Sequence, residues 1–396
     1  MRAVFTPSHA AGTVSAPPSK SFAHRYLICA ALAKGESRIS GVSFSGDVRA
    51  TVGCLRRLGA KITAEEDGIV SVCGIGGLPP VPASPLFCRE SGSTLRFLIP
   101  LALAGSGITL FSGSDRLLSR PLGVYEEIAA ENGLTFARSG SVLTVGGGLR
   151  PGDFVIDGTE SSQFVTGLLF SLPLLNGDST LTVLPPVNSA PYIEMTLSAL
   201  NGFGIRIGQK GEHSYLIPGN QICHPASVTV EGDWSNAAAL LALGPDVTVT
   251  GLDPDSKQGD RIIVRHLEAM RNGTPTIDLA DCPDLGPVLF AAAALEHGAR
   301  FLHTERLRLK ECDRIDAMAE ELRKCGVGME IRSDSVFVPG KSVRAPRVPL
   351  SSHNDHRIVM ALSVLLFGVG GEITGAEAVD KSFPGFFDAL EKLKRE

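Results

Sequence analysis

The chain has 396 residues, of which 43% are hydrophobic and 20% charged, and its formal net charge is −5. This is the composition of a globular protein, and the length favours two domains over a single core. The acidic balance argues against a nucleic-acid partner and against attraction to an anionic membrane surface. We therefore expect small-molecule ligands, and we expect neither nucleic acid nor membrane as a partner.

The eight cysteines form no C-x-x-C pair and show no spacing typical of metal ligands. A chain of this size needs no disulfide staples, so reduced and mostly buried thiols are the expected state. Residues Met1–Phe5 lack an extended apolar signal core, and the apolar runs are shorter than the roughly 18 residues that a membrane span requires. These features predict a cytoplasmic protein.

One order of elements recurs along the chain: small polar residues open an apolar helix, a strand follows, an amphipathic helix ends at or near glycine, and a hairpin closes the unit. The apolar helices are predicted at 22–33, 95–104, 164–175, 237–244, 285–297 and 358–367. The amphipathic helices are predicted at 48–58, 125–132, 193–200, 262–271, 315–325 and 386–393. A hairpin turn is expected at Asp67-Gly68. The unit openings are about 70 residues apart, except for one shorter step between Ser235 and Asp284.

Six such βαβαββ units predict two domains of three units each. We expect one discontinuous domain of residues 1–18 and 229–396, and a second domain of residues 19–228. The last unit runs out of chain, so Met1–Phe5 and Thr13–Ala16 are expected to supply its missing strands. Because the apolar helices should be central, their N-termini would meet at one end of each domain. If those two ends face each other, six helix N-termini line one cleft.

The stretch from Pro17 to Arg25 places a stiff turn, two hydroxyls and two cations at the start of the first apolar helix. Proline pre-sets the turn before a helix, and either Ser19 or Ser21 is the expected cap. The first N–H groups of a helix lack internal partners and the helix dipole is positive there, so these amides, Lys20 and Arg25 suit a phosphate or carboxylate. The alternative is an ordinary capped core helix with two solvated cations.

Cations also gather near the other helix starts. They are Arg120, Lys310, Arg314, Arg357 and Lys381. Lys310 and Arg314 are four residues apart, so on one helix both would project from the same face while Ile315 packs inward. Such a crowd of cations favours a strongly anionic ligand, and the alternative is a set of solvated first turns.

The carboxylates and histidines near the helix starts have more than one interpretation. Asp284 follows Pro283 at an N-cap position, where a carboxylate is common for structural reasons alone. Asn354 could cap the last apolar helix. His353 and His356 could bind a metal or pair with carboxylates, and because no third ligand has motif spacing we expect no metal.

Three widespread motifs are missing from the sequence. They are the phosphate-binding G-x-x-x-x-G-K-[ST], the strand-to-helix G-x-G-x-x-G and the nucleophile motif G-x-S-x-G. Nucleotide binding and serine-hydrolase chemistry therefore lose support.

Several motifs, taken together, resemble those of a known family. In chain order they are Ser19-Lys20-Ser21-x-x-x-Arg25, Gly92-Ser93-x-x-Arg96, Arg120-Pro121, Ser161-Ser162-Gln163, Lys310-Glu311-x-Asp313-Arg314, Asp355-His356-Arg357 and Lys381-x-Phe383-Pro384. Over the whole chain this series is similar to that of the 5-enolpyruvylshikimate-3-phosphate (EPSP) synthases, also called 3-phosphoshikimate 1-carboxyvinyltransferases, which are enolpyruvyl transferases. The resemblance implies an α/β (α+β) fold: a two-domain inverse α/β barrel, each domain made of three βαβαββ units around buried parallel helices, with the active site in the interdomain cleft.

The resemblance also implies a reaction. The enolpyruvyl group of phosphoenolpyruvate would pass to the 5-hydroxyl of shikimate-3-phosphate by addition and elimination through a tetrahedral intermediate, with release of phosphate, on the shikimate pathway to chorismate and the aromatic amino acids. No cofactor and no metal are expected, and the protein would be a monomer. Each substrate carries a carboxylate and a phosphate, so the cations must neutralise roughly five or six negative charges.

Site residues follow from the same resemblance. Asp284 would accept the 5-hydroxyl proton, Glu311 would handle the proton at the methylene carbon, and Lys20 would also be catalytic. The residues implied to bind shikimate-3-phosphate are Lys20, Ser21, Arg25, Ser161, Ser162, Gln163, Ser189, Tyr192, Asp284, Arg306 and Lys310. Those implied to bind phosphoenolpyruvate are Lys20, Gly92, Arg120, Gln163, Lys310, Arg314, Arg357 and Lys381. The chain departs from the usual family pattern at Glu90, where a neutral residue is expected, and at Arg306, where an Asn is usual.

Two other functions remain as alternatives. The sister enzyme that acts on UDP-N-acetylglucosamine usually has Lys-Asn where this chain has Lys20-Ser21. It also has a reactive Cys in a loop that corresponds to residues 116–120 of this chain, which contain no Cys. A non-catalytic anion-binding relative is the other alternative, and the presence of Asp284, Glu311 and Arg314 argues against it.

Overall fold

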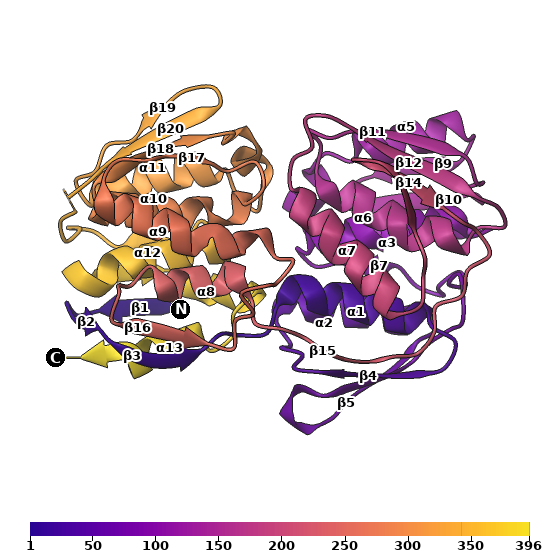
Figure 1. Ribbon diagram of the computed structural model, residues 1–396, viewed down its shortest axis with the longest axis horizontal. Coiled ribbons are helices and arrows are strands. Elements are labelled where there is room, and N and C mark those ends of the chain that lie inside the picture. The colour runs from indigo at the N-terminus through magenta and orange to yellow at the C-terminus, as the bar shows by residue number, and fades with distance from the viewer. Residues whose placement is uncertain (342, 396) are drawn as a thin grey trace. The chain divides into compact units, whose positions relative to one another are not determined.

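The computed structural model describes residues 1–341 and 343–395 (Figure 1). Ser342 and Glu396 fall inside the predicted discontinuous domain but lie outside the described residues. The chain divides into two compact units, residues 1–19 with 231–396 (the split unit) and residues 20–230 (the continuous unit). The domain boundaries predicted above differ from these by one residue at the first crossing and by two at the second.

The continuous unit contains three four-stranded sheets with the same topology: β15–β4–β6–β5, β7–β8–β10–β9 and β11–β12–β14–β13. In each sheet the first two strands are parallel and the last three run antiparallel to their neighbours. Strand β15, at the end of this unit, pairs in parallel with β4 and so serves as the first strand of the first sheet. The strands are β4 (Glu36–Ser40), β5 (Lys61–Ala64), β6 (Val70–Cys73), β7 (Leu86–Phe87), β8 (Ile108–Ser112), β9 (Thr135–Ser139), β10 (Val142–Gly146), β11 (Asp153–Asp157), β12 (Ser179–Leu184), β13 (Gly208–Gly211), β14 (Ser214–Ile217) and β15 (Ser227–Thr229).

The helices of the continuous unit follow the predicted division into buried and peripheral. Helices α1 (Lys20–Leu32), α3 (Gly92–Ala104) and α6 (Ser162–Ser171) are buried along almost their whole length. The others are α2 (Gly46–Arg57), α4 (Asp115–Ser119), α5 (Gly123–Glu131), α7 (Ala190–Gly202), η1 (Glu66–Gly68) and η2 (Leu172–Leu174). Helix α6 ends before the predicted residue 175, because Pro173 cannot continue the α-helical hydrogen bonds and the chain passes into η2.

The hairpin turn predicted at Asp67-Gly68 is confirmed. Both residues have positive φ, 56° and 71°, which is the left-handed conformation that such a turn requires. The strands on either side, β5 and β6, pair antiparallel.

The split unit repeats the topology once in full, in the sheet β17–β18–β20–β19, and otherwise in pieces: the sheet β1–β22–β21 and the pairs β3–β16 and β2–β23. The N-terminal strand β1 pairs antiparallel with β22, so the start of the chain completes the last sheet, as predicted. The strands are β1 (Arg2–Phe5), β2 (His9–Ala10), β3 (Gly12–Ser15), β16 (Val247–Thr250), β17 (Thr276–Asp278), β18 (Gly298–Leu302), β19 (Glu330–Ile331), β20 (Ser335–Pro339), β21 (Leu350–Ser351), β22 (Gly371–Thr374) and β23 (Lys394–Arg395).

The prediction that Thr13–Ala16 also joins the last unit is wrong. Strand β3 pairs in parallel with β16 instead. Within the split unit, β3 is followed by helix α8 (Trp234–Leu241) and then by β16, because residues 20–230 form the continuous unit. These three elements make the βαβ crossover of the fourth repeat, and the continuous unit is inserted between β3 and α8. The chain passes from α9 (Ile263–Asn272) to β17 without a hairpin, which explains the one short step in the repeat.

Helices α10 (Gly286–Leu295) and α12 (His356–Val369) are buried along most of their length and pack against each other in the split unit. The remaining helices of this unit are α11 (Arg314–Lys324), α13 (Phe386–Leu393), η3 (Gly259–Ile262), η4 (Pro283–Leu285), η5 (Glu305–Leu309) and η6 (Ala376–Lys381). Each unit has its own hydrophobic core. Among the described residues, no helix combines the length and the apolar character needed to cross a bilayer. All eight cysteines are free thiols, and six of them are buried.

Candidate functional site

In the continuous unit, Lys20 is the first residue of α1, and its ammonium lies 3.0 Å from Oδ2 of Asp47 on α2. Both side chains are mostly buried, so the carboxylate holds the lysine in one place beside the N–H groups of the helix start. The hydroxyl of Ser19 donates to Oε1 of Gln258 in the split unit, to which Ser19 also belongs (3.3 Å). No sequence pattern predicted a role for Asp47, which lies on the amphipathic helix α2.

Arg25 joins α1 to α7 through three hydrogen bonds. Its Nε donates to Oγ1 of Thr196, Nη1 to the carbonyl of Ser21 and Nη2 to the carbonyl of Tyr192, each at 2.9 Å. The guanidinium is buried, and burial lowers the pKa of Arg25 to about 10. Arg25 therefore fixes the position of Tyr192 relative to Ser21.

A buried chain of hydrogen bonds links α1 to the start of α3. Nδ1 of His24 bonds Oγ1 of Thr51, which bonds Oγ1 of Thr94, which donates to Oγ of Ser91, each at 2.7 Å. Ser91 is the N-cap of α3 and accepts from the N–H of Thr94. Burial, followed by the nearby charge of Lys20, lowers the pKa of His24 well below its usual value, so the ring is neutral at pH 7.

Gly92 leaves space that a neighbouring guanidinium fills. A Cβ atom added at Gly92 would lie 2.6 Å from Nη1 of Arg120. Next to this pair, Nη1 of Arg96 donates to Oε1 of Gln163 (2.8 Å), and Nε2 of Gln163 donates to Oγ of Ser93 (3.0 Å). The starts of α3 and α6 are thus joined by side chains, and two arginines lie beside them.

The remaining predicted residues of this unit also lie at helix starts. Ser161 is the N-cap of α6, where its hydroxyl accepts from the N–H of Gln163, and Ser162 is the buried first residue of that helix. Ser189 precedes α7 in the left-handed conformation, with φ of 60°. Together with the bond from Arg25 to Tyr192, these contacts bring the starts of α1, α3, α6 and α7 to one end of the continuous unit.

In the split unit the candidate site is centred on Arg314, the first residue of α11, whose side chain is 1% exposed. Its Nε donates to Oδ2 of Asp355 (2.8 Å), its Nη1 to Oδ1 of Asp284 (2.9 Å) and its Nη2 to Oε2 of Glu311 (2.8 Å). Burial acts to lower the pKa of Arg314, but the three carboxylates raise it well above the usual value. One permanent cation therefore orients three carboxylates.

Exposure separates these carboxylates into two kinds. The side chain of Asp355 is 0% exposed, whereas those of Asp284 and Glu311 keep 26% and 18% of their surface. Asp355 and Arg314 form a buried scaffold, and the other two carboxylates remain within reach of a ligand. No role was predicted for Asp355 from the sequence, although an Asp directly before an apolar helix is a typical N-cap residue.

Lys310 reaches the same cluster from outside the helix. The prediction that Lys310 and Arg314 share one helical face is wrong, because Asp313 caps α11 through the N–H groups of residues 315 and 316 and Lys310 lies in the preceding loop. Its ammonium lies 3.1 Å from Oδ1 of Asp284. Burial lowers the pKa of Lys310, Asp284 acts to raise it, and the nearby charges of Arg314 and Arg306 lower it further. Ile315 packs inward, as predicted.

Asp284 was predicted at an N-cap position, and this is also wrong. It lies inside the turn η4, whose N-cap is Cys282 and makes no side-chain cap bond. The carboxylate of Asp284 instead bonds Arg314 and Lys310, because two cations attract it more strongly than a single backbone N–H does.

The start of α12 holds the other predicted cations. Asp355, not Asn354, caps this helix by accepting from the N–H of Arg357 (2.8 Å). Nη1 of Arg357 donates to the carbonyl of Ser235 (2.8 Å), and its Nη2 lies 3.9 Å from Oδ2 of Asp284. The ammonium of Lys381 donates to the carbonyl of Asn354 (2.5 Å). These contacts join the starts of α8, α10, α11 and α12.

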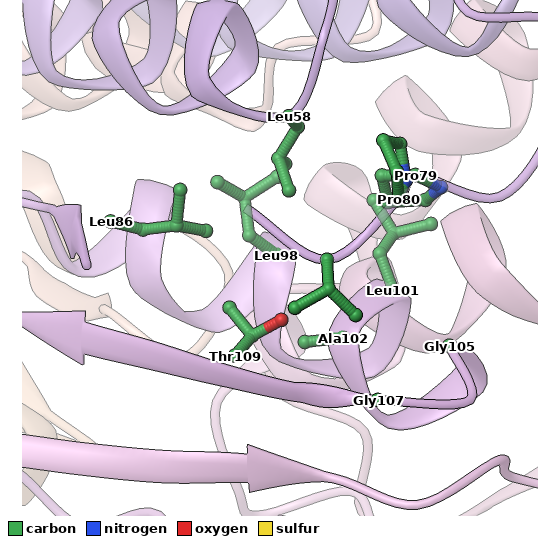
Figure 2. Close-up of a pocket in the computed structure, with 11 residues that line it drawn as sticks. Leu58, Pro79, Pro80, Leu86, Leu98, Leu101, Ala102, Gly105, Gly107 and Thr109 are labelled. Carbon is green, nitrogen blue, oxygen red and sulfur yellow. The ribbon is translucent and has the colours of Figure 1, made fainter. Parts of the chain in front are cut away.

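One small cavity in the continuous unit does not belong to the candidate site. It is lined by Leu58, the loop from Pro79 to Val81 and the C-terminal half of α3, as Figure 2 shows, and its volume is about 10 Å³. Such a space holds about one water molecule. It lies near the opposite end of α3 from Gly92, so we regard it as a packing gap.

Comparison with known proteins agrees with the motif series. The sequence model of the family described as EPSP synthase (3-phosphoshikimate 1-carboxyvinyltransferase) matches residues 4–390. A Clostridium perfringens protein named 3-phosphoshikimate 1-carboxyvinyltransferase is 39% identical over 419 residues, which cover 99% of this chain and 98% of the relative. A Clostridium kluyveri protein of the same name is 41% identical over 413 residues, covering 98% and 96%.

Solved structures agree on the fold. The EPSP synthase of Acinetobacter baumannii matches with a TM-score of 0.79 and 23% identity, over 99% of this chain and 98% of that one. At this identity the likeness concerns the fold, and it bears out the predicted two-domain α/β fold class. With the family match over nearly the whole sequence, the chain belongs to the EPSP synthase family.

Proposed function

We propose that this protein transfers the enolpyruvyl group of phosphoenolpyruvate to the 5-hydroxyl of shikimate-3-phosphate and releases phosphate. Membership of the EPSP synthase family supports this activity, as do the names of relatives that are 37–41% identical over nearly the full chain. The reaction belongs to the shikimate pathway of aromatic amino-acid biosynthesis. It needs acids, bases and cations, all of which side chains supply, and we propose no cofactor.

The observation that carries the proposal is the cluster around Arg314. Two partly exposed carboxylates, Asp284 and Glu311, are each held by one oxygen on the same buried guanidinium. A carboxylate that is fixed and still accessible can exchange protons with a bound substrate at a defined position. The ammonium of Lys310 lies beside them, so an anionic substrate also finds a positive charge there.

The reaction divides the proton transfers between these carboxylates. In the addition step, Asp284 takes the proton of the 5-hydroxyl as the hydroxyl oxygen bonds to C2 of phosphoenolpyruvate, and Glu311, in its protonated form, gives its proton to C3. In the elimination step, Glu311 takes back a proton from C3, the bond from C2 to the phosphate oxygen breaks, and Asp284 returns its proton to the leaving phosphate. Phosphate and the enol ether are the products. Positive charge develops at C2 in the transition state once C3 is protonated, and a pre-positioned carboxylate nearby stabilises that charge.

Anion binding accounts for the remaining polar groups. The residues that we propose to bind shikimate-3-phosphate are Lys20, Ser21, Arg25, Ser161, Ser162, Gln163, Ser189, Tyr192, Arg306 and Lys310. Those that we propose to bind phosphoenolpyruvate are Lys20, Gly92, Arg120, Gln163, Lys310, Arg314, Arg357 and Lys381. The cations at several helix starts support this assignment, because such ends favour phosphates and carboxylates. Since Nη2 of Arg314 is bonded to Glu311, an arriving carboxylate can replace Glu311 there and release it for proton transfer.

The reaction of the UDP-N-acetylglucosamine transferase is not favoured. The family match and the relatives' names point to the shikimate enzyme, and the loop 116–120 contains no cysteine. A catalytically inactive relative is disfavoured by the ordered cluster of Asp284, Glu311 and Arg314. We also propose a cytoplasmic monomer, which light scattering coupled to size-exclusion chromatography would test.

The activity is tested by phosphate release from the purified protein with both substrates, in parallel with reactions that omit one of them. Release that requires both substrates, with an equal amount of the enolpyruvyl product, is the expected result. Binding of shikimate-3-phosphate without any turnover would identify an anion-binding relative instead.

A further inference from the structure

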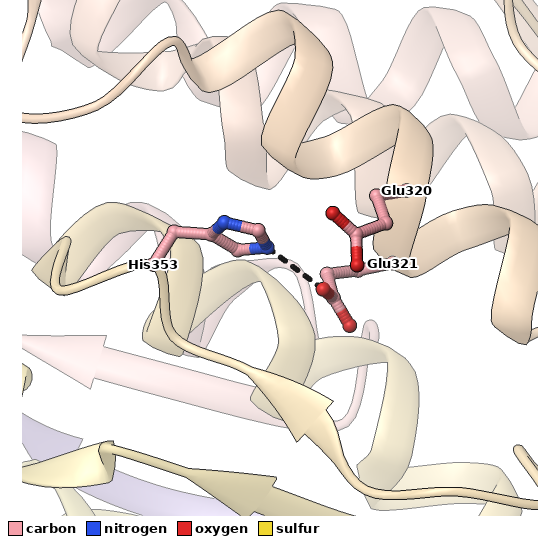
Figure 3. A group of neighbouring side chains, drawn as sticks. All are labelled: Glu320, Glu321 and His353. Atoms are coloured by element: carbon pink, nitrogen blue, oxygen red, sulfur yellow. Dashed lines mark hydrogen bonds and ion pairs between the residues drawn. The ribbon is translucent and has the colours of Figure 1, made fainter.

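Glu321, on α11, is a buried carboxylate to which the proposed reaction gives no role. Its side chain is 0% exposed, and both of its oxygens accept hydrogen bonds from Lys324 (2.8 and 3.0 Å). Nε2 of His353 lies 2.7 Å from Oε1, and the N–H of Ser351 donates to Oε2 (3.0 Å). Figure 3 shows the imidazole pointing directly at this carboxylate, across from α11.

The group does not fit a metal site. Ligand atoms of Glu320, Glu321 and His353 lie within 4.8 Å of one another, as a metal site would require. However, the ammonium of Lys324 already lies among them, 2.9 Å from Glu320 and 2.8 Å from Glu321. A second cation there would be repelled by the first, so this is a carboxylate pairing of His353.

The segment that Glu321 holds leads directly into the candidate site. His353 and Asn354 both have left-handed backbones, with φ of 47° and 54°. Residues with side chains rarely adopt this conformation, and two in a row persist only when the surroundings hold them. The next residue, Asp355, bonds Arg314 and caps the helix that carries Arg357.

Helix α11 therefore contacts this segment at two points. Arg314, at the start of α11, bonds Asp355, and Glu321, about two turns later on the same helix, bonds Ser351 and His353. The carbonyl of Asn354, between these points, accepts from Lys381. The turn of residues 351–354 thus has its backbone fixed from α11 on one side and from η6 on the other.

We propose that Glu321 and His353 are positioning residues for phosphoenolpyruvate binding: by holding the turn 351–354, they place Asp355, and through it Arg314 and Arg357, in the binding geometry. This inference rests on the proposed function. A substitution that shifts a substrate-binding guanidinium by about 1 Å can lower the reaction rate up to about a hundredfold, even when the substituted residue itself touches no substrate.

His353→Ala is the primary test, because it leaves Glu321 paired with Lys324 and His353 itself is not in the core. The KM for phosphoenolpyruvate should rise about tenfold, while the KM for shikimate-3-phosphate should change by less than about twofold. His353→Gln keeps an N–H donor for Glu321 and should restore most of the loss. Both variants keep a side chain at the left-handed position, so backbone strain is matched.

Glu320→Gln is the control, because Glu320 pairs with Lys324 on the same helix and not with the turn, and its kinetics should match the wild type. Equal rises in both KM values, no rise in either, or failure of His353→Gln to recover would overturn the inference. Glu321→Gln should repeat the His353→Ala pattern if it folds. A wild-type protein that releases no phosphate would instead refute the proposed function.

Discussion

Gly92→Ala offers a quantitative test of the phosphoenolpyruvate assignment. The added Cβ would lie 2.6 Å from Nη1 and 3.1 Å from Cζ of Arg120, whereas ordinary contacts begin at 3.4 Å. The guanidinium must therefore move by about 0.8 Å, the difference between 3.4 and 2.6 Å. The helix itself accepts alanine at its first turn, so the fold should persist.

A displacement of this size should lower kcat/KM for phosphoenolpyruvate between about tenfold and about a hundredfold, or about 1.4 to 2.7 kcal/mol. Phosphate release should be measured by varying each substrate while the other is saturating, and the KM for shikimate-3-phosphate should change little. Gly123→Ala is a matched control, because Gly123 is also the first residue of a helix and has nothing within 4 Å of an added Cβ. An unchanged kcat/KM for phosphoenolpyruvate in Gly92→Ala would refute the role given to Arg120.

Three further predictions follow from the contacts described above. Arg357→Ala should raise the KM for phosphoenolpyruvate far more than that for shikimate-3-phosphate in the same assay, and equal effects would contradict its assignment. Arg25→Met removes the three hydrogen bonds to Ser21, Tyr192 and Thr196, so the free energy of unfolding should fall by about 3 kcal/mol in urea titrations; a change below about 0.5 kcal/mol would show that the contacts are dispensable. Because burial lowers the pKa of His24, the unfolded chain binds a proton that the folded chain does not as the pH falls below about 6.5. The free energy of unfolding should therefore decrease below that pH, less so in His24→Asn, and identical pH profiles would show that His24 does not titrate on unfolding.

Local sequence patterns were sufficient for most of the elements. The runs that became α3 and α10 are apolar on all sides, so only a buried helix suits them, and the glycine stops marked the ends of several amphipathic helices. The pairing of strands depends on distant segments, which local patterns do not encode. Strand β3 could have joined either of two sheets, and its neighbour β16 lies beyond the whole continuous unit.

The site residues differ in the same way. Motif spacing identified Lys310, Glu311 and Arg314, but not the partners that orient them. Asp47, on α2, and Asp355, the N-cap of α12, hold Lys20 and Arg314 from other parts of the chain, so their role appears only when the chain is folded. Asp284 looked like a cap because capping is a local preference, which the attraction of two cations overcame.

The central claim is tested most directly by phosphate release from the purified wild-type protein when both phosphoenolpyruvate and shikimate-3-phosphate are present. We predict sustained turnover that depends on both substrates and is reduced at least a hundredfold in Glu311→Gln, because the proton at C3 then has no donor; general acid–base groups contribute about a hundredfold to ten-thousandfold. Binding of both substrates without phosphate release, or release with UDP-N-acetylglucosamine in place of shikimate-3-phosphate, would contradict it.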